Sequence, residues 1–465
     1  MRADVVLEEI VEYCRREGMA ESTFGRRAVN DGKFVNRLRY GGKVNETTVE
    51  RVRSFIGGTV NPDMAGALKN DLIALPQGGG AQPLSESTPE KNFRFYDNRQ
   101  KYLMFVNTCS EKWVVAQRVA LELANLHVHP PAIRLFDAGV GDGTILTRVM
   151  RTIHRRHPWV PLYVVGKEIS LEDVRLSMEK MPDRFQEHPA TCLVMTNMNY
   201  AEAPWLAPHS VAAASSMVWK EVALRGNSAA EFDEQIAEMQ PFLAENWGAT
   251  VSKKSGNPVY AKPMVLVVYR EDCRFLLDHI MPRRGAVRAD YDLVIASQPY
   301  RARASTGFKA KRVIAPLTRA LAPGGRLIGV HSCGADPGLE IVQAVWPGEH
   351  PFETNRHDLL KATRSELGAD ARYYNFNSYS DVRSLFRYDM HTLPGEIDAE
   401  NASIGTSTLF AAWNNATYVA QVEDERLAEA MTSGAYLEST REVLNRHGGL
   451  WFNDESFIIS RKRDR

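Results

Sequence analysis

A glycine-rich segment, residues 137–144 with the sequence DAGVGDGT, carries the residues best suited to chemistry in this chain. It follows an apolar run, residues 133–136, and precedes apolar residues at helical spacing: Ile145, Leu146, Val149, Met150 and Ile153. Glycine has no β-carbon, so three positions let a ligand approach the backbone: Gly139, Gly141 and Gly143. Thr144 can cap the helix. The segment predicts a strand, a ligand-binding loop and a helix.

The spacing of the glycines separates two kinds of nucleotide loop. The dinucleotide fingerprint G-x-G-x-x-G needs a glycine where Thr144 stands, whereas this loop reads G-x-G-x-G behind an acidic residue. In this it resembles the first motif of the class I S-adenosylmethionine-dependent methyltransferases. The resemblance implies a Rossmann-like α/β fold, S-adenosylmethionine as the cofactor, and a cofactor-binding loop made of Asp137, Ala138, Gly139, Gly141, Gly143 and Thr144.

Two further apolar runs end in polar residues, in the order that this family shows. Residues 162–165 lead into Gly166-Lys167-Glu168, and an acid at the end of the second strand can accept hydrogen bonds from a ribose diol. Residues 192–195 lead into Thr196-Asn197, where the family places a polar side chain near the adenine amine. Asn199 competes with Asn197 for that role. We therefore expect Glu168 and Asn197 in the cofactor site.

The fourth and fifth expected strands supply the candidates for catalysis. Residues 291–297 end in Ser297-Gln-Pro-Tyr300, and residues 321–331 contain Pro-Gly-Gly, which predicts a turn between a helix and a strand. Amino-methylating relatives carry Asn or Asp and then Pro-Pro-Tyr or Phe at the first place, so only Pro299 and Tyr300 match. Ser297 would border the cofactor and Tyr300 the substrate. His331 could act as a base and Cys333 as a thiol, although packing in the core explains Tyr300 equally well.

Methyl transfer from a sulfonium demands alignment of donor and nucleophile, and removal of a proton where the nucleophile carries one. Few catalytic groups are needed, so the sequence does not identify the methyl acceptor.

The first 58 residues predict a helical unit of helix-turn-helix type, with four short helices and tight turns between them. Residues 24–39 resemble the N-terminal part of some bacterial repressor-like proteins. Six basic residues against one acid between Arg26 and Lys43 could meet phosphates. The candidate DNA contacts are Arg26, Arg27, Lys33, Asn36, Arg37 and Arg39. A solvated basic face or a dimerisation module are the alternatives, so a homodimer is one expectation.

Residues 59–91 are rich in Gly, Pro and Ser and predict a flexible linker, and residues 92–465 form the expected Rossmann-like domain. Tyr96 and Tyr102 precede the first strand, where related enzymes close over the cofactor. Residues 200–290 are too long for one crossover and predict an insertion that shapes the pocket or merely extends the fold. Residues 408–422 predict a β-hairpin about Asn414-Asn415, the antiparallel end of a mostly parallel sheet.

Composition indicates the class of protein to which the chain belongs. With 44% hydrophobic residues, 25% charged residues, and 57 basic against 57 acidic residues, the chain is typical of a globular protein and not of a disordered or membrane one. Charge interrupts the first residues too early for a signal peptide, and the cysteines are scattered. We expect a cytoplasmic, bacterial protein with no metal and no membrane partner. The alternatives to a plain methyltransferase are a DNA-binding regulator that senses the cofactor and a DNA methyltransferase.

Overall fold

The computed structural model describes residues 3–16, 19, 21–29, 31, 34–39, 46–56, 99–128, 130–252, 258–377, 379–392, 397–398 and 403–463. The chain divides into two compact units, Met1–Pro89 and Glu90–Arg465. The expected linker at 59–91 and Tyr96 lie outside the described residues.

The first unit contains, in its described part, four helices: α1 (Ala3–Arg16), α2 (Glu21–Val29), α3 (Phe34–Arg39) and α4 (Glu46–Ile56). They bury a shared apolar core that includes Val6, Ile10, Phe24, Phe34, Leu38 and Val52. The rings of Tyr13, Phe24 and Phe55 meet edge to face at 5.3 to 5.9 Å, an arrangement that aromatic quadrupoles favour. The four predicted helices are confirmed, whereas their use in DNA binding stays a prediction.

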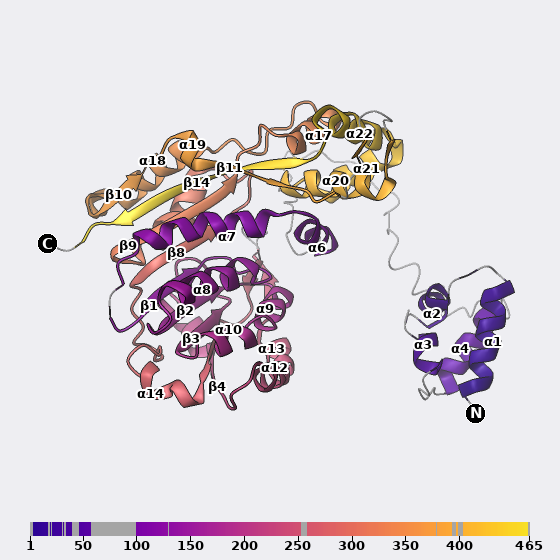
Figure 1. Cartoon of the computed structure of the whole chain (residues 1–465), viewed down its shortest axis with the longest axis horizontal. Coiled ribbons are helices and arrows are strands. Elements are labelled where there is room, and N and C mark those ends of the chain that lie inside the picture. Colours follow the sequence, from indigo (N-terminus) through magenta and orange to yellow (C-terminus); the bar gives the residue numbers. More distant parts are fainter. Residues whose placement is uncertain are drawn as a thin grey trace, which may run out of the picture. The chain divides into compact units, whose positions relative to one another are not determined.

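One large sheet forms the centre of the second unit, with the strand order β10-β14-β9-β8-β1-β2-β3-β7-β4 (Figure 1). Five neighbouring strands run parallel: β1 (Ile133–Asp137), β2 (Leu162–Lys167), β3 (Thr191–Thr196), β8 (Tyr291–Ser297) and β9 (Leu321–Ser332). Their residues are mostly buried and apolar, as in a parallel sheet covered on both faces. The predicted α/β class with a mostly parallel, Rossmann-like sheet is confirmed.

The sheet ends in antiparallel strands near the C-terminus. The long strand β14 (Trp451–Arg461) runs antiparallel to β9 and also pairs with β10 (Tyr374–Asn377) and β11 (Leu385–Asp389). The predicted antiparallel C-terminal edge is therefore present, but other residues than 408–422 form it.

The hairpin predicted at 408–422 is wrong, because those residues belong mainly to helix α20 (Thr406–Val419). Its buried face repeats every three or four residues: Leu409, Ala412, Trp413 and Ala416. Asn415 does not mark a turn, since its amide nitrogen donates to Thr108 Oγ1 at 2.8 Å inside the core. Tertiary packing has overridden the β propensity of the aromatic and β-branched residues.

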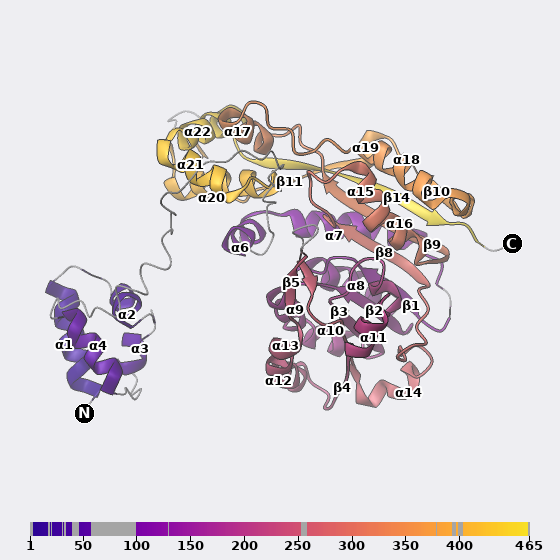
Figure 2. The same cartoon turned by 180° about the vertical axis from the view of Figure 1, so that it is seen from behind.

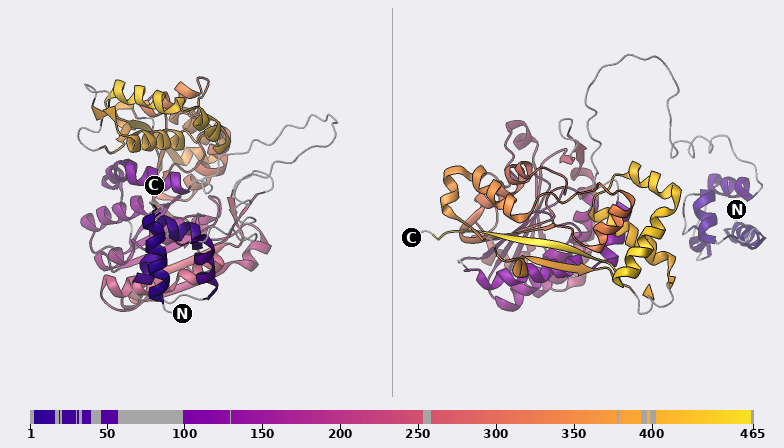
Figure 3. Two further views of the ribbon diagram at one scale, coloured as in Figure 1. Left: turned by 90° about the vertical axis from the view of Figure 1, so that its right-hand side faces the viewer. Right: turned by 90° about the horizontal axis from the view of Figure 1, so that it is seen from above.

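Helices cover both faces of the sheet (Figures 1 and 2). One face packs against α7 (Glu111–Glu122), α8 (Thr144–Arg156), α9 (Leu171–Met178) and α10 (Pro182–Glu187). The other packs against α14 (Arg274–Leu277), α15 (Thr306–Lys309), a π-helical turn (Ala310–Ile314), α16 (Ala315–Arg319) and α18 (Arg356–Leu367). A third core joins α6 (Arg99–Thr108), α17 (Pro337–Val345), α20, α21 (Asp424–Ser433) and α22 (Ala435–His447) (Figure 3).

The insertion at 200–290 is ordered over most of its length and widens the sheet. Strand β7 (Met264–Arg270) lies antiparallel to β3, and β4 (Val218–Leu224) follows it at the edge. Between them in sequence lie α12 (Ala229–Glu238), α13 (Gln240–Asn246), β5 (Ala249–Val251) and β6 (Pro258–Tyr260). The shorter elements of the unit are α11 (Val211–Ser216), α19 (Asp381–Ser384), β12 (Ile397–Asp398) and β13 (Ser403–Ile404).

The Pro-Gly-Gly segment, residues 323–325, lies within β9 and not in a turn before it, which corrects the prediction. The pairing of β8 with β9 shifts register between Tyr291 and Leu293, opposite this segment. Gly324 has a φ of +81°, and a β-carbon on Gly325 would lie 2.4 Å from the carbonyl oxygen of Tyr291. The glycines therefore serve a bulge at which two backbones touch.

Candidate functional site

The glycine-rich loop joins the carboxyl end of β1 to α8. A β-carbon on Gly139 would meet, among the described atoms within 4 Å, only the carbonyl oxygen of Ser297 at 3.9 Å. One on Gly141 would lie 3.1 Å from the hydroxyl of Tyr102, and Gly141 has a φ of +54°. Both glycines are partly exposed. The backbone is therefore accessible in part at both glycines, and the left-handed φ of Gly141 is one that glycine adopts most readily.

The missing β-carbon of Gly143 serves packing and does not open the backbone to a ligand as expected, whereas the place of Gly143 in a cofactor site stays a prediction. It is buried, its φ is +81°, and a β-carbon there would lie 2.8 Å from Cα of Ser177 in α9. Removing the β-carbon lets the start of α8 touch α9 directly, which is a role that the last glycine of nucleotide-binding loops also has.

Gly143→Ala is expected to lower the free energy of unfolding by about 2 to 4 kcal/mol, because left-handed backbone adds to a clash with the Ser177 backbone. Urea denaturation measures this loss. Gly434→Ala is the matched control, since its φ is +67° but no described atom lies within 4 Å of an added β-carbon. It should cost about 1 kcal/mol. Equal losses in the two variants would contradict the packing role.

Asp142, and not Thr144, closes the start of α8. The predicted cap is wrong because Gly143 occupies the cap position and Thr144 is the first helical residue. Asp142 Oδ1 accepts from the Thr144 backbone nitrogen at 3.3 Å, and Lys180 Nζ donates to Asp142 Oδ2 at 2.6 Å. Burial alone would raise the pKa of Asp142, but Lys112 and Lys180 hold it below its ordinary value. The loop is thus tied to α9 and its following turn by an ion pair.

Glu168 ties the loop after β2 to the glycine-rich loop. Its Oε2 accepts from the backbone nitrogen of Gly141 at 2.9 Å. Its Oε1 accepts from the backbone nitrogens of Ile169 at 2.7 Å and Ser170 at 2.9 Å. The acid and the glycine-rich loop thus lie within hydrogen-bond distance, so one nucleoside-sized ligand could reach both. The carboxylate retains lone pairs beyond these three bonds.

A cavity of about 350 Å³ lies beside this junction. Its size is at the lower end of the range of small-molecule pockets. Three segments supply its walls, namely α6, the residues after β2 and the insertion: Arg99, Tyr102, Ile169, Ser170, Leu171, Glu172, Asp173, Trp247 and Ala249. The insertion therefore shapes this pocket as well as extending the sheet.

Two wall residues, Trp247 and Arg99, were missed in the sequence. Trp247 is 2% exposed and its Nε1 donates to the carbonyl oxygen of Glu168 at 3.2 Å. A tryptophan within the predicted insertion at 200–290 was the available signal. Arg99 pairs with Asp173 at 3.1 Å, and nothing in its sequence context pointed to a site. Burial, helped by Glu168 and opposed by Arg99, raises the pKa of Asp173 to about 6.

Tyr102 stands over the glycine-rich loop from α6. Its hydroxyl accepts from the backbone nitrogen of Asp142 at 3.3 Å, and its ring lies 5.8 Å from Lys112 Nζ. The side chain is 3% exposed and lines the cavity. It is thus positioned to contact a ligand that lies on the loop.

Asp137 brings an unusual carboxyl group to the end of β1. Its Oδ1 accepts from the backbone nitrogen of Gly139 at 3.1 Å, but no described donor reaches Oδ2. Burial, with the nearby charge of Glu168, raises the pKa of Asp137 to about 7. A buried oxygen without a partner is costly, and a ligand that donates a hydrogen bond or carries positive charge would remove that cost.

Asn197 ends β3, but its amide serves the backbone of β7. Its Nδ2 donates to the carbonyl oxygen of Lys262 at 2.9 Å, and its Oδ1 accepts from the backbone nitrogen of Met264 at 2.8 Å. The alternative, Asn199, bonds within its own turn to Ala201 and Glu202. Neither lines the cavity described above, and their role near adenine stays a prediction.

Asn197→Ala tests that role. If the amide only anchors β7, the variant loses about 1 to 3 kcal/mol of unfolding free energy, because the buried Met264 nitrogen loses its partner. The affinity for S-adenosylhomocysteine, measured by calorimetry, then changes by less than about threefold, equivalent to under 1 kcal/mol. Asn199→Ala, at an exposed turn, is the control for stability. A loss of affinity of about tenfold or more in Asn197→Ala would instead support an adenine contact.

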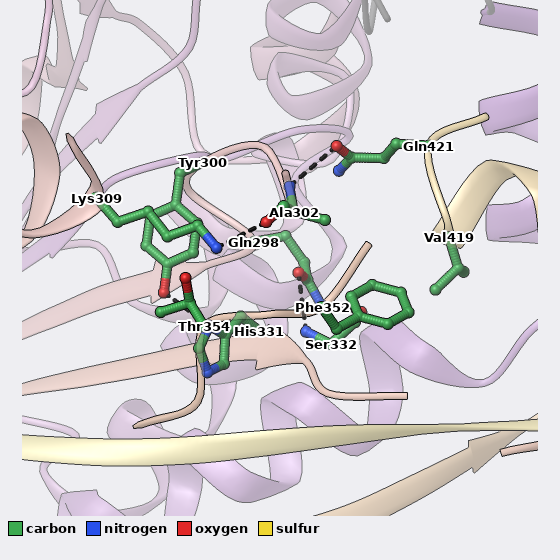
Figure 4. Close-up of a pocket in the computed structure, with 10 residues that line it drawn as sticks. All are labelled: Gln298, Tyr300, Ala302, Lys309, His331, Ser332, Phe352, Thr354, Val419 and Gln421. Carbon is green, nitrogen blue, oxygen red and sulfur yellow. Dashed lines mark hydrogen bonds between the residues drawn. The ribbon is translucent and has the colours of Figure 1, made fainter. Parts of the chain in front are cut away.

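A second, smaller cavity of about 20 Å³ lies at the ends of β8 and β9 (Figure 4). Tyr300 and His331 both line it, and the Tyr300 hydroxyl lies 2.9 Å from His331 Nδ1. The structure thus brings two of the three predicted catalytic residues into contact. Ser297 is buried beside the glycine-rich loop, and no described group bonds to its Oγ. Burial raises the pKa of Cys333 well above its ordinary value, which disfavours its thiolate.

The first unit presents part of the predicted DNA-binding set. Arg37 pairs with Asp31 at 2.8 Å, and Arg39 binds both carboxylate oxygens of Glu21 at 2.7 and 2.8 Å. These exposed pairs reduce the positive charge available to phosphates. Asn36 is exposed. The remaining candidates fall outside the described side chains: Arg26, Arg27 and Lys33. DNA contact stays a prediction.

No three or more His, Cys, Asp and Glu side chains in the described ranges gather where they could hold a metal ion. Within the same ranges, no helix has the length and apolar character needed to cross a membrane.

Comparisons with known proteins give a weak likeness. No protein-family model matches the chain, and no curated protein matches it. Three solved structures illustrate the matches. A geranyl diphosphate methyltransferase with GPP and sinefungin is 12% identical, with a TM-score of 0.29, over 75% of this chain and 77% of its own. A protein from Listeria monocytogenes assigned to the class I S-adenosylmethionine-dependent methyltransferases is 9% identical, with a TM-score of 0.27, over 99% and 89%. PKMT2 of Rickettsia typhi with AdoHcy is 10% identical, with a TM-score of 0.24, over 75% and 53%. The fold described above therefore rests on strand order and not on these likenesses.

Proposed function

We propose that the second unit binds S-adenosylmethionine and transfers its methyl group to an acceptor. The observation that carries the proposal is the junction of the open Gly141 backbone, the Glu168 carboxylate bonded to it and the cavity beside them. In open α/β sheets, ligands bind outside the carboxyl ends of the strands where the strand order reverses, which here is beside β1.

The residues at this junction suit the three parts of that cofactor. Tyr102, Ile169 and Trp247 give the cavity apolar and aromatic walls for a planar base. Glu168 has lone pairs left for ribose hydroxyls. Asp137 Oδ2, which no described donor reaches, suits an ammonium group. When bound, S-adenosylmethionine would supply a methyl group on a positively charged sulfur.

The acceptor is expected at the ends of β8 and β9. The carbonyl oxygen of Ser297 lies 3.9 Å from the β-carbon position of Gly139, so the loop after β8 borders the cofactor loop. Tyr300 and His331 follow in that region and line the smaller cavity. These groups would face the reacting atoms while the glycine-rich loop holds the donor.

The direct test has two measurements on the full chain. Titration calorimetry should show binding of S-adenosylmethionine and S-adenosylhomocysteine, and binding of nicotinamide cofactors in their place would reject the proposal. Labelled-methyl transfer to DNA, protein and metabolite fractions of a lysate should then show which fraction holds the acceptor. Cofactor binding without methyl transfer to any fraction would support a protein that senses the cofactor and would contradict an enzymatic role.

A further inference from the structure

A continuous chain of hydrogen bonds leads away from the smaller cavity. The Tyr300 hydroxyl lies 2.9 Å from His331 Nδ1, and His331 Nε2 lies 2.9 Å from Glu455 Oε1 on β14. His331 is 3% exposed and Glu455 2% exposed, and the side chains of Tyr300 and His331 both line the cavity (Figure 4). The chain of hydrogen bonds therefore connects the wall of the smaller cavity with a buried carboxylate.

Arg356 keeps the Glu455 carboxylate, at the far end of the hydrogen-bond chain, in its ionised form. Its Nη1 donates to Glu455 Oε2 at 2.7 Å, and its backbone nitrogen donates to Glu455 Oε1 at 2.6 Å. Asp381 also pairs with Arg356. Burial would raise the pKa of Glu455, but His331 and Arg356 lower it below its ordinary value.

The ionised carboxylate fixes the direction of the chain. A carboxylate only accepts hydrogen bonds, so His331 Nε2 must carry a proton and donate it to Glu455. When the imidazole is neutral, its lone pair is then on Nδ1, which can accept from the Tyr300 hydroxyl. The Tyr300 oxygen keeps lone pairs that can accept a further hydrogen bond, and Tyr300 lines the cavity. The order from hydroxyl to imidazole to carboxylate is that of a proton-accepting triad.

We propose that the hydrogen-bonded relay of Tyr300, His331 and Glu455 removes the proton of the methyl acceptor, and that the acceptor is a hydroxyl group. The inference rests on the proposed function. The acceptor oxygen forms the new bond to the methyl carbon, while the donor's carbon–sulfur bond breaks and its electron pair stays on sulfur. The hydroxyl proton passes to Tyr300 Oη as the proton of Tyr300 passes to His331 Nδ1. The resulting imidazolium is neutralised by Glu455.

Among the possible acceptor groups, a hydroxyl depends most on a base that removes its proton. A neutral alcohol or phenol that gains a methyl group becomes a strongly acidic oxonium unless its proton leaves, so it needs a base at the moment of transfer. An amine that is unprotonated when bound, such as an aromatic amine, attacks through a lone pair that it already has. A thiol, with an ordinary pKa near 8.5, ionises without much help. A buried relay has most to contribute where the proton is hardest to remove.

Lys309 is a buried neighbour of Tyr300. Lys309 Nζ lies 5.2 Å from the centre of the Tyr300 ring and donates to the carbonyl oxygen of Ala302 at 2.7 Å. Lys309 is 2% exposed, and burial lowers its pKa to about 8. It covers the ring from α15, opposite His331 on β9. The charged and titratable groups that face the chain from its neighbouring elements are Lys309, Cys333, Arg356, Asp381, Asp454 and Glu455.

The experiment uses the full chain, tritiated-methyl S-adenosylmethionine and a cell extract as the source of acceptors. Labelled product should be a methyl ether, which is neutral and resists the alkali that releases methanol from esters. Tyr300→Phe should slow transfer by about 10² to 10³-fold, within the range of general acid–base catalysis. The rate should rise with pH in the wild type, and His331→Gln should lose that rise.

Matched measurements separate chemistry from folding. Tyr163→Phe removes the same atom from a buried tyrosine of β2 and should keep the wild-type rate. Both tyrosine variants should bind S-adenosylhomocysteine within about threefold of the wild type, equivalent to under 1 kcal/mol. Glu455→Gln tests the positioning residue, since it leaves Tyr300 intact but should abolish the rise with pH.

The failures of the two proposals are distinguishable. Label in an amine, thioether or ester product, or a Tyr300→Phe rate close to that of the wild type, would overturn the relay. Cofactor binding with no labelled product would also overturn it, because the relay would have no transfer to serve. A wild-type chain that binds neither S-adenosylmethionine nor S-adenosylhomocysteine would overturn the proposed function itself.

Discussion

Gly141→Leu is expected to weaken the proposed binding of S-adenosylhomocysteine by at least ~100-fold, a loss of about 2.7 kcal/mol. The β-carbon alone would lie 3.1 Å from the Tyr102 hydroxyl, and the rest of the leucine side chain must take space beside the loop that the cofactor would use. The φ of +54° also disfavours a branched side chain, so the loop must move away from Glu168, which bonds to the Gly141 nitrogen. Titration calorimetry measures the affinity.

Gly285→Leu provides the matched control for that result. Gly285 lies in the loop before β8 with a φ of +78°, and no described atom lies within 4 Å of an added β-carbon. The two variants therefore share the backbone strain and differ in the site. Gly285→Leu should lose a similar amount of stability and keep its affinity. A Gly141→Leu chain that folds and binds as tightly as the wild type would place the ligand elsewhere.

The strands that hold the site could be predicted because each is a buried apolar run followed by a polar or glycine residue. Residues 133–136 and 162–165 needed only this local pattern to be assigned to β1 and β2. The segment 408–422 shows where the pattern fails. Its apolar residues fit both a hairpin and a helix, and the choice was made by contacts with α6, such as Asn415 to Thr108, that the sequence does not reveal.

The candidate site was predictable to the same extent. Glu168 was found because a strand end places it, and the geometry then showed its bond to Gly141. Trp247 was missed because it comes from the insertion, far along the chain. Gly143 was assigned to the ligand, although its neighbour is Ser177, because a sequence shows that a β-carbon is absent but not what occupies the space. Glu455 gave no signal, since its partners are 99 and 124 residues away.

Asp137 is expected to make the free energy of unfolding fall as pH rises from about 4 to about 7. Its pKa is raised by burial, with a contribution from Glu168, from an ordinary 3.8 to about 7. Over that range the folded chain keeps a proton that the unfolded chain has released, and stability then decreases with pH. The cost is absent below the unfolded pKa and complete above the folded one, where it reaches about 4 kcal/mol.

Asp137→Asn should remove this component. The amide keeps an oxygen to accept from the Gly139 nitrogen but carries no charge, so the variant gains stability over the wild type as pH rises from 4 to 8. Urea denaturation at several pH values measures the difference. Asp183→Asn, which changes an exposed carboxyl of α10, is the control. If the curves of unfolding free energy against pH ran parallel for the wild type and Asp137→Asn, Asp137 would not be the group that lowers stability as pH rises.

The same carboxyl gives cofactor binding a proton linkage. A ligand that brings an ammonium group to Asp137 favours the ionised form, so binding at pH 6 should release a proton from a residue that is mostly protonated in the free chain. Affinity for S-adenosylhomocysteine should therefore rise with pH, by at most tenfold per unit below pH 7. Calorimetry in buffers of different ionisation enthalpy counts the released protons. Asp137→Asn should bind more weakly and release none, and a wild type whose binding releases no proton at pH 6 would separate Asp137 from the ligand.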